Sequence, residues 1–479
     1  MVATRQFCQS SCKAEEVTTE NYDLIIVGTG SGNSVINDEM DGWRIAIVER
    51  WTFGGTCLNR GCIPSKILVY AADVAESAAH DNGPQYGVTT RFESADWPAI
   101  VHRVFARIDP IVESGRQYRY GLPNVTVYPG DARFVGERTL EVDGQMITGD
   151  QVVIATGARP FIPAIHGIDE VPYETSDTIM HIERQPKHLL LLGGGFIAAE
   201  LGHVFRSLGS QVTIINRGHH LLGAEDRDIS TRYTELAAER FELRLGTQVH
   251  RVYMTAGGIG MHLTCNGGEE TLEGDTLLVA AGRLPNGDQI DAHLAGVDVG
   301  PIGNVIVDQY GHTSAPGVWA LGDVNGRYQL KHMANGEAKV IQHNLLHPDD
   351  LRKLDTRPAP HAVFGSPQVG AVGLTEAQAA ALGRPISVVS HPYGDAAYGW
   401  ALEDTSGFCK LIGDPATRTL LGAHVIGYQA SMLVQLLVQG MHLGSTVDEL
   451  AVGQVWIHPA LSEVVEQALL KLIRAFNES

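Results

Sequence analysis

The sequence repeats one local pattern twice: a short apolar strand that runs directly into a glycine-rich turn. The first copy passes from residues 24–27 into Gly28-Thr29-Gly30-Ser31-Gly32-Asn33, and the second passes from residues 189–192 into Gly193-Gly194-Gly195. A buried strand, such a turn and a following helix form the phosphate-binding start of a Rossmann unit. The two copies predict an α/β fold with two Rossmann-like dinucleotide-binding domains.

In the first copy, residues 44–48 form a second expected strand that ends in Glu49. A carboxylate about 20 residues after the turn hydrogen-bonds a ribose 2′-hydroxyl in such units. Glycine triplets also make ordinary turns, but strand, turn, helix and acid together favour a nucleotide site. The third glycine position holds Asn33, so we expect the helix and the strand to pack less closely there.

The second copy differs from the first at the acidic position. Its next strand, residues 211–215, ends in Asn216-Arg217 where the first copy has Glu49. A carboxylate suits an unphosphorylated ribose, whereas an arginine accommodates a 2′-phosphate. This switch favours NADPH over NADH as the second nucleotide, with NADH still possible. The alternative, that Arg217 is a solvated surface residue, stays open.

Cys57 and Cys62 lie five residues apart, just after the first copy. A disulfide needs Cα atoms roughly 4.4–6.8 Å apart, whereas residues i and i+5 of a regular helix are separated by about 7.5 Å along the axis alone. A bridge would therefore require distorted backbone, which neighbouring glycines permit. These glycines are Gly54, Gly55 and Gly61. Because Pro64 favours the opening turn of a helix, we expect a strained loop that runs into a helix.

This cysteine pair predicts a redox-active dithiol. The partial positive charge of the helix N-terminus, together with Lys66, would favour the thiolate that takes part in exchange. A buried thiol pair and a metal site are the alternatives. A metal would need further ligands, and no CxxC motif or Cys/His cluster supplies them nearby. We therefore predict no metal.

Composition narrows the class of partner. The formal net charge of −20 argues against nucleic acid and anionic membranes, because both select basic patches. No apolar run reaches the roughly 20 residues of a membrane span. Six cysteines are too few for a secreted disulfide framework, and the first 20 residues lack the apolar core of a secretory signal. We predict a cytoplasmic protein with small-molecule partners; Cys8 and Cys12 are either incidental or a second thiol relay.

Together these motifs resemble one known family. A Cys-x4-Cys pair after a glycine fingerprint, a second fingerprint, a short strand ending at Gly322-Asp323 and the run 456–463 (Trp-Ile-His-Pro-Ala-Leu-Ser-Glu) are similar to those of the FAD-dependent pyridine nucleotide-disulfide reductases. The resemblance extends from Tyr22 to the C-terminus. It implies an NAD(P)H-dependent, FAD-containing disulfide oxidoreductase.

The resemblance also implies roles for the cysteines and for one histidine. Electrons would pass from NADPH through FAD to the Cys57–Cys62 disulfide, with Cys62 as the flavin-side sulfur and Cys57 as the interchange thiol. His458, held by Glu463, would be the acid/base beside Cys57. In this family the histidine comes from the other subunit, which implies a homodimer with an active site shared between subunits.

Cofactor contacts are implied for residues that match the family's motifs. They are Gly28, Gly30, Gly32, Glu49, Gly55, Thr56, Lys66, Ala132, Thr156, Gly157, Asp323, Lys331, Gly193, Gly195, Ile197, Glu200, Asn216, Arg217 and Gly282. Among them, Lys66 and Glu200 match a pair near flavin N5. Lys331 opens an expected helix whose N-terminal dipole would stabilise negative charge on the flavin N1/O2 edge.

The domain division follows from the motifs and the resemblance. The run 155–160 is mirrored by 280–285, and the stretch 346–360 is an expected linker. We predict a flexible N-terminal extension (1–20), an FAD-binding domain (21–160), an NAD(P)H-binding domain (161–286), a central FAD domain (287–355) and a C-terminal α+β dimerisation domain (356–479).

The substrate is the finest expectation. The runs 28–34, 196–200, 398–407 and 458–466 resemble the branch of the family that reduces mycothione, the disulfide of the sugar-bearing thiol mycothiol. We expect this low-molecular-weight disulfide as the substrate.

Two other functions stay open. One is a dihydrolipoamide dehydrogenase that uses NAD, against which Trp456 and Asn216-Arg217 count. The other is a non-catalytic flavoprotein scaffold or redox sensor, against which the cysteine pair and His458 count. Gly223 stands where glutathione reductase has its second phosphate-binding arginine, so the sequence does not predict a strict NADPH preference.

Overall fold

The computed structural model describes residues 19–79 and 86–478. Its first sheet has the strand order β3-β2-β1-β6-β5-β4, with β17 paired to β6. Its strands are β1 (Thr19–Val27), β2 (Ile45–Glu49), β3 (Val125–Pro129), β4 (Ala132–Gly136), β5 (Thr139–Val142), β6 (Gln145–Ile154) and β17 (Val318–Ala320). Five of these strands are parallel, so their carboxyl ends meet at one edge, where nucleotides bind in such sheets.

The start of β1 corrects the expected N-terminal extension. Residues 19 and 20 pair with β6 and therefore belong to the sheet. The rest of the extension, with Cys8 and Cys12, lies outside the described residues.

The first nucleotide unit lacks the α-helix that its sequence pattern predicts after the glycine turn. Between β1 and β2 the chain forms two 3-10 turns, η1 (Gly32–Ser34) and η2 (Asp38–Met40). Asn37 between them is extended, with φ −137° and ψ 177°. Asn, Ser and Asp side chains compete for backbone hydrogen bonds and favour turns over helix interiors. The predicted helix was therefore wrong, because this short polar segment closes as turns.

Close packing at this turn comes from Gly32. A Cβ atom on Gly32 would lie 2.6 Å from the Cβ of Ala155 and 3.0 Å from the Cγ2 of Ile26. Only glycine fits so near the ends of two central strands. The turn therefore stays against the sheet even though Asn33 occupies the third fingerprint position.

The second nucleotide unit has the predicted order of strand, turn, helix and strand. These elements are β9 (His188–Leu192), α4 (Phe196–Ser207) and β10 (Gln211–Ile215), in a sheet of order β11-β10-β9-β15-β8. Its other elements are β8 (Glu174–Thr175), α5 (Arg227–Ala238), β11 (Glu242–Arg244), β15 (Thr276–Val279) and the antiparallel strands β12 (Gln248–Met254), β13 (Ile259–Cys265) and β14 (Gly268–Gly274). The two mirrored runs of the sequence pair with each other as β7 (Ala158–Pro160) and β16 (Arg283–Pro285).

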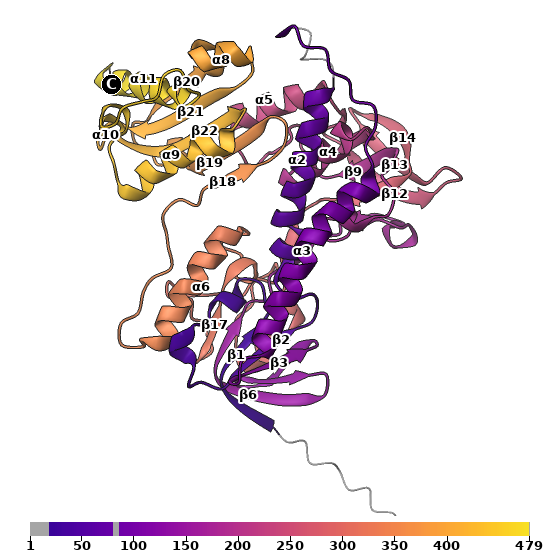
Figure 1. Ribbon diagram of the computed structural model, residues 1–479, viewed down its shortest axis with the longest axis vertical. Coiled ribbons are helices and arrows are strands. Elements are labelled where there is room, and N and C mark those ends of the chain that lie inside the picture. The colour runs from indigo at the N-terminus through magenta and orange to yellow at the C-terminus, as the bar shows by residue number, and fades with distance from the viewer. Residues whose placement is uncertain (1–18, 80–85, 479) are drawn as a thin grey trace, which may run out of the picture.

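The C-terminal part is an α+β domain, orange to yellow in Figure 1. It follows α6 (Lys331–Leu346) and a connection without strand or helix, and its sheet has the order β18-β19-β22-β21-β20. The strands are β18 (His361–Val363), β19 (Gln368–Gly373), β20 (Ser387–Pro392), β21 (Phe408–Asp414) and β22 (Thr419–Gly427). The helices are α7 (Glu376–Ala380), α8 (Ala397–Leu402), α9 (Ala430–Leu443), α10 (Val447–Val452) and α11 (Glu463–Glu478). The predicted fold class is confirmed.

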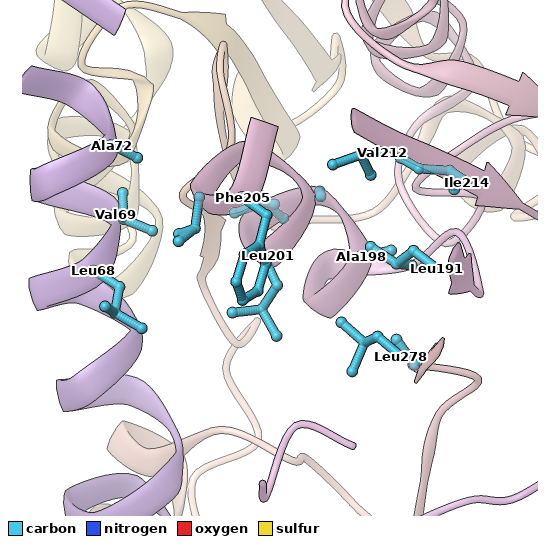
Figure 2. Packing of buried hydrophobic residues seen from close by; sticks show 14 of the residues in the cluster. Leu68, Val69, Ala72, Leu191, Ala198, Leu201, Phe205, Val212, Ile214 and Leu278 are labelled. Carbon is cyan, nitrogen blue, oxygen red and sulfur yellow. The ribbon is translucent and has the colours of Figure 1, made fainter. Parts of the chain in front are cut away.

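Three helices connect the nucleotide units. They are α1 (Gly55–Arg60), α2 (Cys62–Ala78) and α3 (Trp97–Tyr120). Figure 2 shows Leu68, Val69 and Ala72 of α2 facing Leu201 and Phe205 of α4, all of them buried. Burying each large side chain of this kind stabilises the fold by about 1.5–3 kcal/mol. This core fixes the cysteine-bearing helix against the second nucleotide unit. No helix among the described residues is long and apolar enough to cross a membrane.

Candidate active site

Cys57 and Cys62 form a disulfide across the junction of α1 and α2, with their Cα atoms 4.7 Å apart. Cys57 lies inside α1, not in the loop expected from the sequence, and Cys62 is the first residue of α2. The helices are separated by Gly61, whose φ of −142° and ψ of −120° are helical in neither angle. This break shortens the i to i+5 separation enough for the bridge.

The disulfide lies close to the first glycine turn. Gly55, with φ of +70°, begins α1, and a Cβ on it would lie 2.6 Å from the Cα of Gly30. No other residue type allows both this φ and this approach. The segment that carries Cys57 is therefore seated on the turn at which the sequence predicts a pyrophosphate.

Glu49 is held by the turn that precedes it. Thr29 donates to Glu49 Oε2 from its backbone N–H at 2.9 Å and from its hydroxyl at 2.5 Å, and Trp51 N–H donates to Glu49 Oε1 at 2.9 Å. A carboxylate has lone pairs beyond these three bonds. Sequence reasoning missed Thr29, although its place between two fingerprint glycines was a usable signal. Ala132 begins β4 two residues after Gly130, whose N–H donates to Glu49 O at 3.1 Å.

Three of the predicted FAD contacts follow the carboxyl ends of β6 and β17 in the first sheet: Thr156, Gly157 and Asp323. The hydroxyl of Thr156 is buried without a hydrogen-bond partner, and Gly157 has φ of +68° with open space where a Cβ would lie. Burial raises the pKa of Asp323 above its usual value, against the opposing charges of Arg283 and Lys331. The unpaired hydroxyl of Thr156, the open space beside Gly157 and the half-buried carboxyl group of Asp323 suit a dinucleotide with many hydroxyl groups. These residues therefore fit FAD.

Lys66 and Glu200 form an ion pair between the two nucleotide units. Lys66 Nζ lies 2.5 Å from Glu200 Oε2, and Phe364 N–H donates to Glu200 Oε1 at 3.0 Å. Glu200 is 5% exposed, so both of its oxygens are used inside the protein. Sequence reasoning did not find Phe364, because a backbone donor carries no side-chain signal. An open cavity of about 440 Å³ is lined by Cys62, Ile63, Lys66, Ile67, Tyr70 and Arg103.

Lys331 lies at the first turn of α6, and its side chain reaches the glycine turn. Its Nζ donates to Ser31 Oγ at 2.9 Å. Burial lowers the pKa of Lys331, and the nearby charge of Asp323 opposes this shift. The ammonium group is therefore directed toward the predicted pyrophosphate turn.

The second nucleotide turn has the backbone that its glycines predict. Gly193 has φ of +132°, and Gly195 precedes α4 directly, with Ile197 in the first turn of that helix. Asn216 Nδ2 donates to Gly218 O at 3.2 Å and to His220 O at 2.9 Å, so this side chain shapes the loop. Arg217 is exposed, and Gly282, with φ of +129°, has open space at its Cβ position.

His458 and Glu463 form a pair in the C-terminal domain. His458 Nδ1 lies 2.7 Å from Glu463 Oε1, and Ala460 N–H donates to Glu463 Oε2 at 3.1 Å. The hydrogen bond to His458 holds the pKa of Glu463 below its usual value, outweighing the smaller effect of burial. The His458 side chain is 71% exposed.

Within one chain the structure does not bring His458 to the cysteines. Figure 1 shows α10 and α11, which flank His458, on the side of the C-terminal domain away from α2. Three apolar side chains near His458 are strongly exposed: Val452 at 70%, Val455 at 96% and Ile457 at 74%. Such a patch marks a protein interaction surface.

The other cysteines among the described residues are remote from this chemistry. Cys265 is partly buried, and Cys409 is buried. Burial raises the pKa of the Cys409 thiol to about 12, so it stays protonated and unreactive at neutral pH.

Comparison with known proteins agrees with the geometry. A profile described as "Pyridine nucleotide-disulphide oxidoreductase" matches residues 22–338, and one described as "Pyridine nucleotide-disulphide oxidoreductase, dimerisation domain" matches residues 359–469. Two nucleotide folds with a disulfide seated between them define an oxidoreductase of disulfides, and the chain belongs to the pyridine nucleotide-disulphide oxidoreductase family. FAD and a nicotinamide nucleotide are the cofactors of this family.

Individual relatives refine this assignment. A mycothione reductase from Mycobacterium tuberculosis (strain ATCC 25618 / H37Rv) is 50% identical over 95% of this chain and 100% of the relative. A dihydrolipoyl dehydrogenase from Chlamydia muridarum (strain MoPn / Nigg) is 30% identical over 94% of this chain and 97% of the relative. The solved structure of the HOCl-induced flavoprotein disulfide reductase RclA from Escherichia coli has a TM-score of 0.81 and 28% identity, covering 95% of this chain and 99% of that chain. The chain is an enzyme and a homologue of mycothione reductase.

Proposed function

We propose that this enzyme reduces mycothione to two molecules of mycothiol, with NADPH as the electron donor. The observation that carries the proposal is the Cys57–Cys62 disulfide at the α1–α2 junction, seated on the first nucleotide turn. The 50% identity to a mycothione reductase supports the substrate. The 30% identity to a dihydrolipoyl dehydrogenase keeps dihydrolipoamide with NAD as the alternative.

When bound, FAD supplies two-electron transfer between the nicotinamide and the dithiol. In the reduced protein, the Cys57 thiolate attacks one sulfur of the substrate disulfide, forms a mixed disulfide and releases one thiol. The Cys62 thiolate then attacks Cys57, restores the bridge and releases the second thiol. His458 protonates the leaving thiolate, and Glu463 orients its ring through Nδ1.

The proposed active site is completed by a second copy of the chain. His458 is exposed and lies on the far side of its own domain from α2. The apolar residues beside it would be buried in a symmetric dimer. The match to a dimerisation domain supports this arrangement. The partner subunit would then supply the acid/base to each disulfide.

The proposed NADPH preference rests on the loop after β10. Asn216 holds the loop through two backbone carbonyls, and Arg217 stays exposed beside it. An exposed guanidinium without a neighbouring acid suits a 2′-phosphate. The proposed cytoplasmic location rests on the low cysteine count. The proposed domain borders at 160, 286 and 355 rest on the positions of the sheets.

Steady-state assays separate the two substrates. We expect mycothione with NADPH to be turned over much faster than dihydrolipoamide with NAD. Appreciable activity only with dihydrolipoamide would refute the proposal. A Cys57→Ser protein should bind FAD normally but lose disulfide reduction, since the interchange sulfur is gone. Normal turnover by that variant would reassign the interchange thiol.

A further inference from the structure

The first nucleotide unit has no α-helix after its glycine turn, and this absence removes a source of charge. In a Rossmann unit the helix N-terminus presents N–H groups and a partial positive charge to the pyrophosphate. Here the turn is followed by the three-residue η1 and then by extended backbone. A turn of that length contributes little dipole.

A buried cation occupies the neighbourhood of this turn. Arg119, in the last turn of α3, is only 8% exposed. Its Nε donates to Asn33 Oδ1 at 2.8 Å, and its Nη2 donates to Asn33 O at 2.7 Å. The guanidinium therefore binds both the side chain and the backbone carbonyl of Asn33, the residue at the third fingerprint position.

Arg119 has no acidic partner in the part of the chain that the structure describes. None of the ion pairs among residues 19–79 and 86–478 involves it. Its guanidinium carbon lies 5.3 Å from the centre of the Tyr118 ring, and burial, the largest influence, lowers its pKa against the effect of Tyr118. The C-terminal end of α3 offers only a partial negative charge. A buried charge without a counter-ion is costly, so such groups are ordinarily paired. A bound anion would complete the site.

The same turn is held from the other side by α6. Lys331 Nζ donates to Ser31 Oγ, Ser31 Oγ donates to Asn335 Oδ1 at 3.1 Å, and Gln342 donates to Val35 O at 2.9 Å. Side chains from two distant helices thus hold a turn that a Rossmann helix would otherwise hold.

We propose that Arg119 replaces the missing helix N-terminus as a positioning residue for the FAD pyrophosphate. It holds the turn through Asn33 and supplies the positive charge that the short η1 lacks. The inference rests on FAD as the cofactor and is independent of which disulfide is reduced.

The test is a binding titration on apoprotein. FAD, ADP and adenosine are titrated into the wild type, Arg119→Gln, Arg119→Lys and the matched control Arg116→Gln, which changes an exposed arginine of the same helix. We expect Arg119→Gln to bind FAD and ADP about tenfold more weakly, the scale of a lost helix-terminus charge, with adenosine unaffected. Arg119→Lys should be intermediate, and Arg116→Gln unchanged.

Two further readouts separate charge from structure. The loss of ADP affinity in Arg119→Gln should shrink as salt is raised, and NADPH binding to the second unit should be normal if the protein is folded. Unchanged FAD affinity, or equal losses for ADP and adenosine, would overturn the proposal. If Arg119→Gln does not fold, the Arg119→Lys protein is the test. Weaker ADP binding than in the wild type, with a dependence on salt, supports the proposal, and wild-type ADP affinity overturns it. Failure of the wild type to reduce mycothione would refute the proposed function but leave these titrations intact.

Discussion

Lys66 on α2 and Glu200 on α4 meet at 2.5 Å although 134 residues separate them in sequence. The pair joins the helix that begins at Cys62 to the helix that follows the glycine turn of the second nucleotide unit. The other oxygen of Glu200 accepts from Phe364 N–H of the C-terminal domain. One buried carboxylate therefore links three parts of the molecule.

Glu200→Gln should slow reduction of the FAD-loaded enzyme by NADPH roughly ten- to a hundredfold, because it leaves the Lys66 charge unpaired where charge is transferred. Anaerobic stopped-flow absorbance measures this rate. The control is Glu76→Gln, which breaks the ion pair of Glu76 with Arg240 in the same interface. Equal rate losses in both variants would show that the Lys66–Glu200 pair is merely structural.

Mixing a Cys57→Ser protein with a His458→Ala protein should restore activity if each site combines residues of two subunits. A mixed dimer then holds one intact site, so random exchange of subunits gives about a quarter of wild-type turnover. The matched control mixes wild type with a chain that carries both changes, whose mixed dimers hold no intact site. No gain above the parent variants would place His458 and Cys57 in the same chain.

Arg217→Ala should raise the KM for NADPH about tenfold and leave the KM for NADH nearly unchanged, because only NADPH carries the 2′-phosphate. Initial rates at varied nucleotide concentration measure both constants. Arg227→Ala, a change at the start of α5, is the control for a general loss of positive charge. Parallel increases for both nucleotides would argue that Arg217 acts on loop shape.

Lys410→Met should destabilise the protein by about 3 kcal/mol, because it leaves the buried carboxylate of Asp226 without its cation. Lys410, 1% exposed, binds Asp226 at 2.8 Å and also reaches Asp228 and Glu376, which ties β21 to the start of α5 and to α7. Urea unfolding at neutral pH measures the loss. Lys471→Met, which removes an exposed lysine of the same domain, should have little effect.

The same cluster sets a stability dependence at low pH. Burial alone would raise the pKa of Asp226, but hydrogen bonds from Lys410 and from the N–H groups of Glu376 and Asp228 lower it overall. A depressed folded-state pKa gives stability that is complete above about pH 4 and is lost as the pH falls through the folded value. Asp226→Asn should therefore flatten the acid limb of a thermal-midpoint profile. An acid limb as steep as that of the wild type would contradict this assignment.

Much of the site was predictable because its signals are local. The glycines before Glu49, the Cys57–Cys62 spacing and the His458–Glu463 run each lie within one short segment, where backbone sterics act directly. The same local reasoning failed between β1 and β2, where a helix was expected. There the polar residues around Asn37 outweighed the analogy with the second unit, and only the folded chain showed which influence prevailed.

By itself the sequence determined the α/β class, the two nucleotide units and the dithiol, because strand-to-turn patterns and cysteine spacing depend on neighbours along the chain. Tertiary structure decided the contacts between distant segments: Lys66 with Glu200, Arg119 with Asn33, and the separation of His458 from Cys57 within one chain. Such contacts depend on how segments far apart in the sequence pack together. Packing is set by the shapes of many side chains at once, which no local pattern encodes.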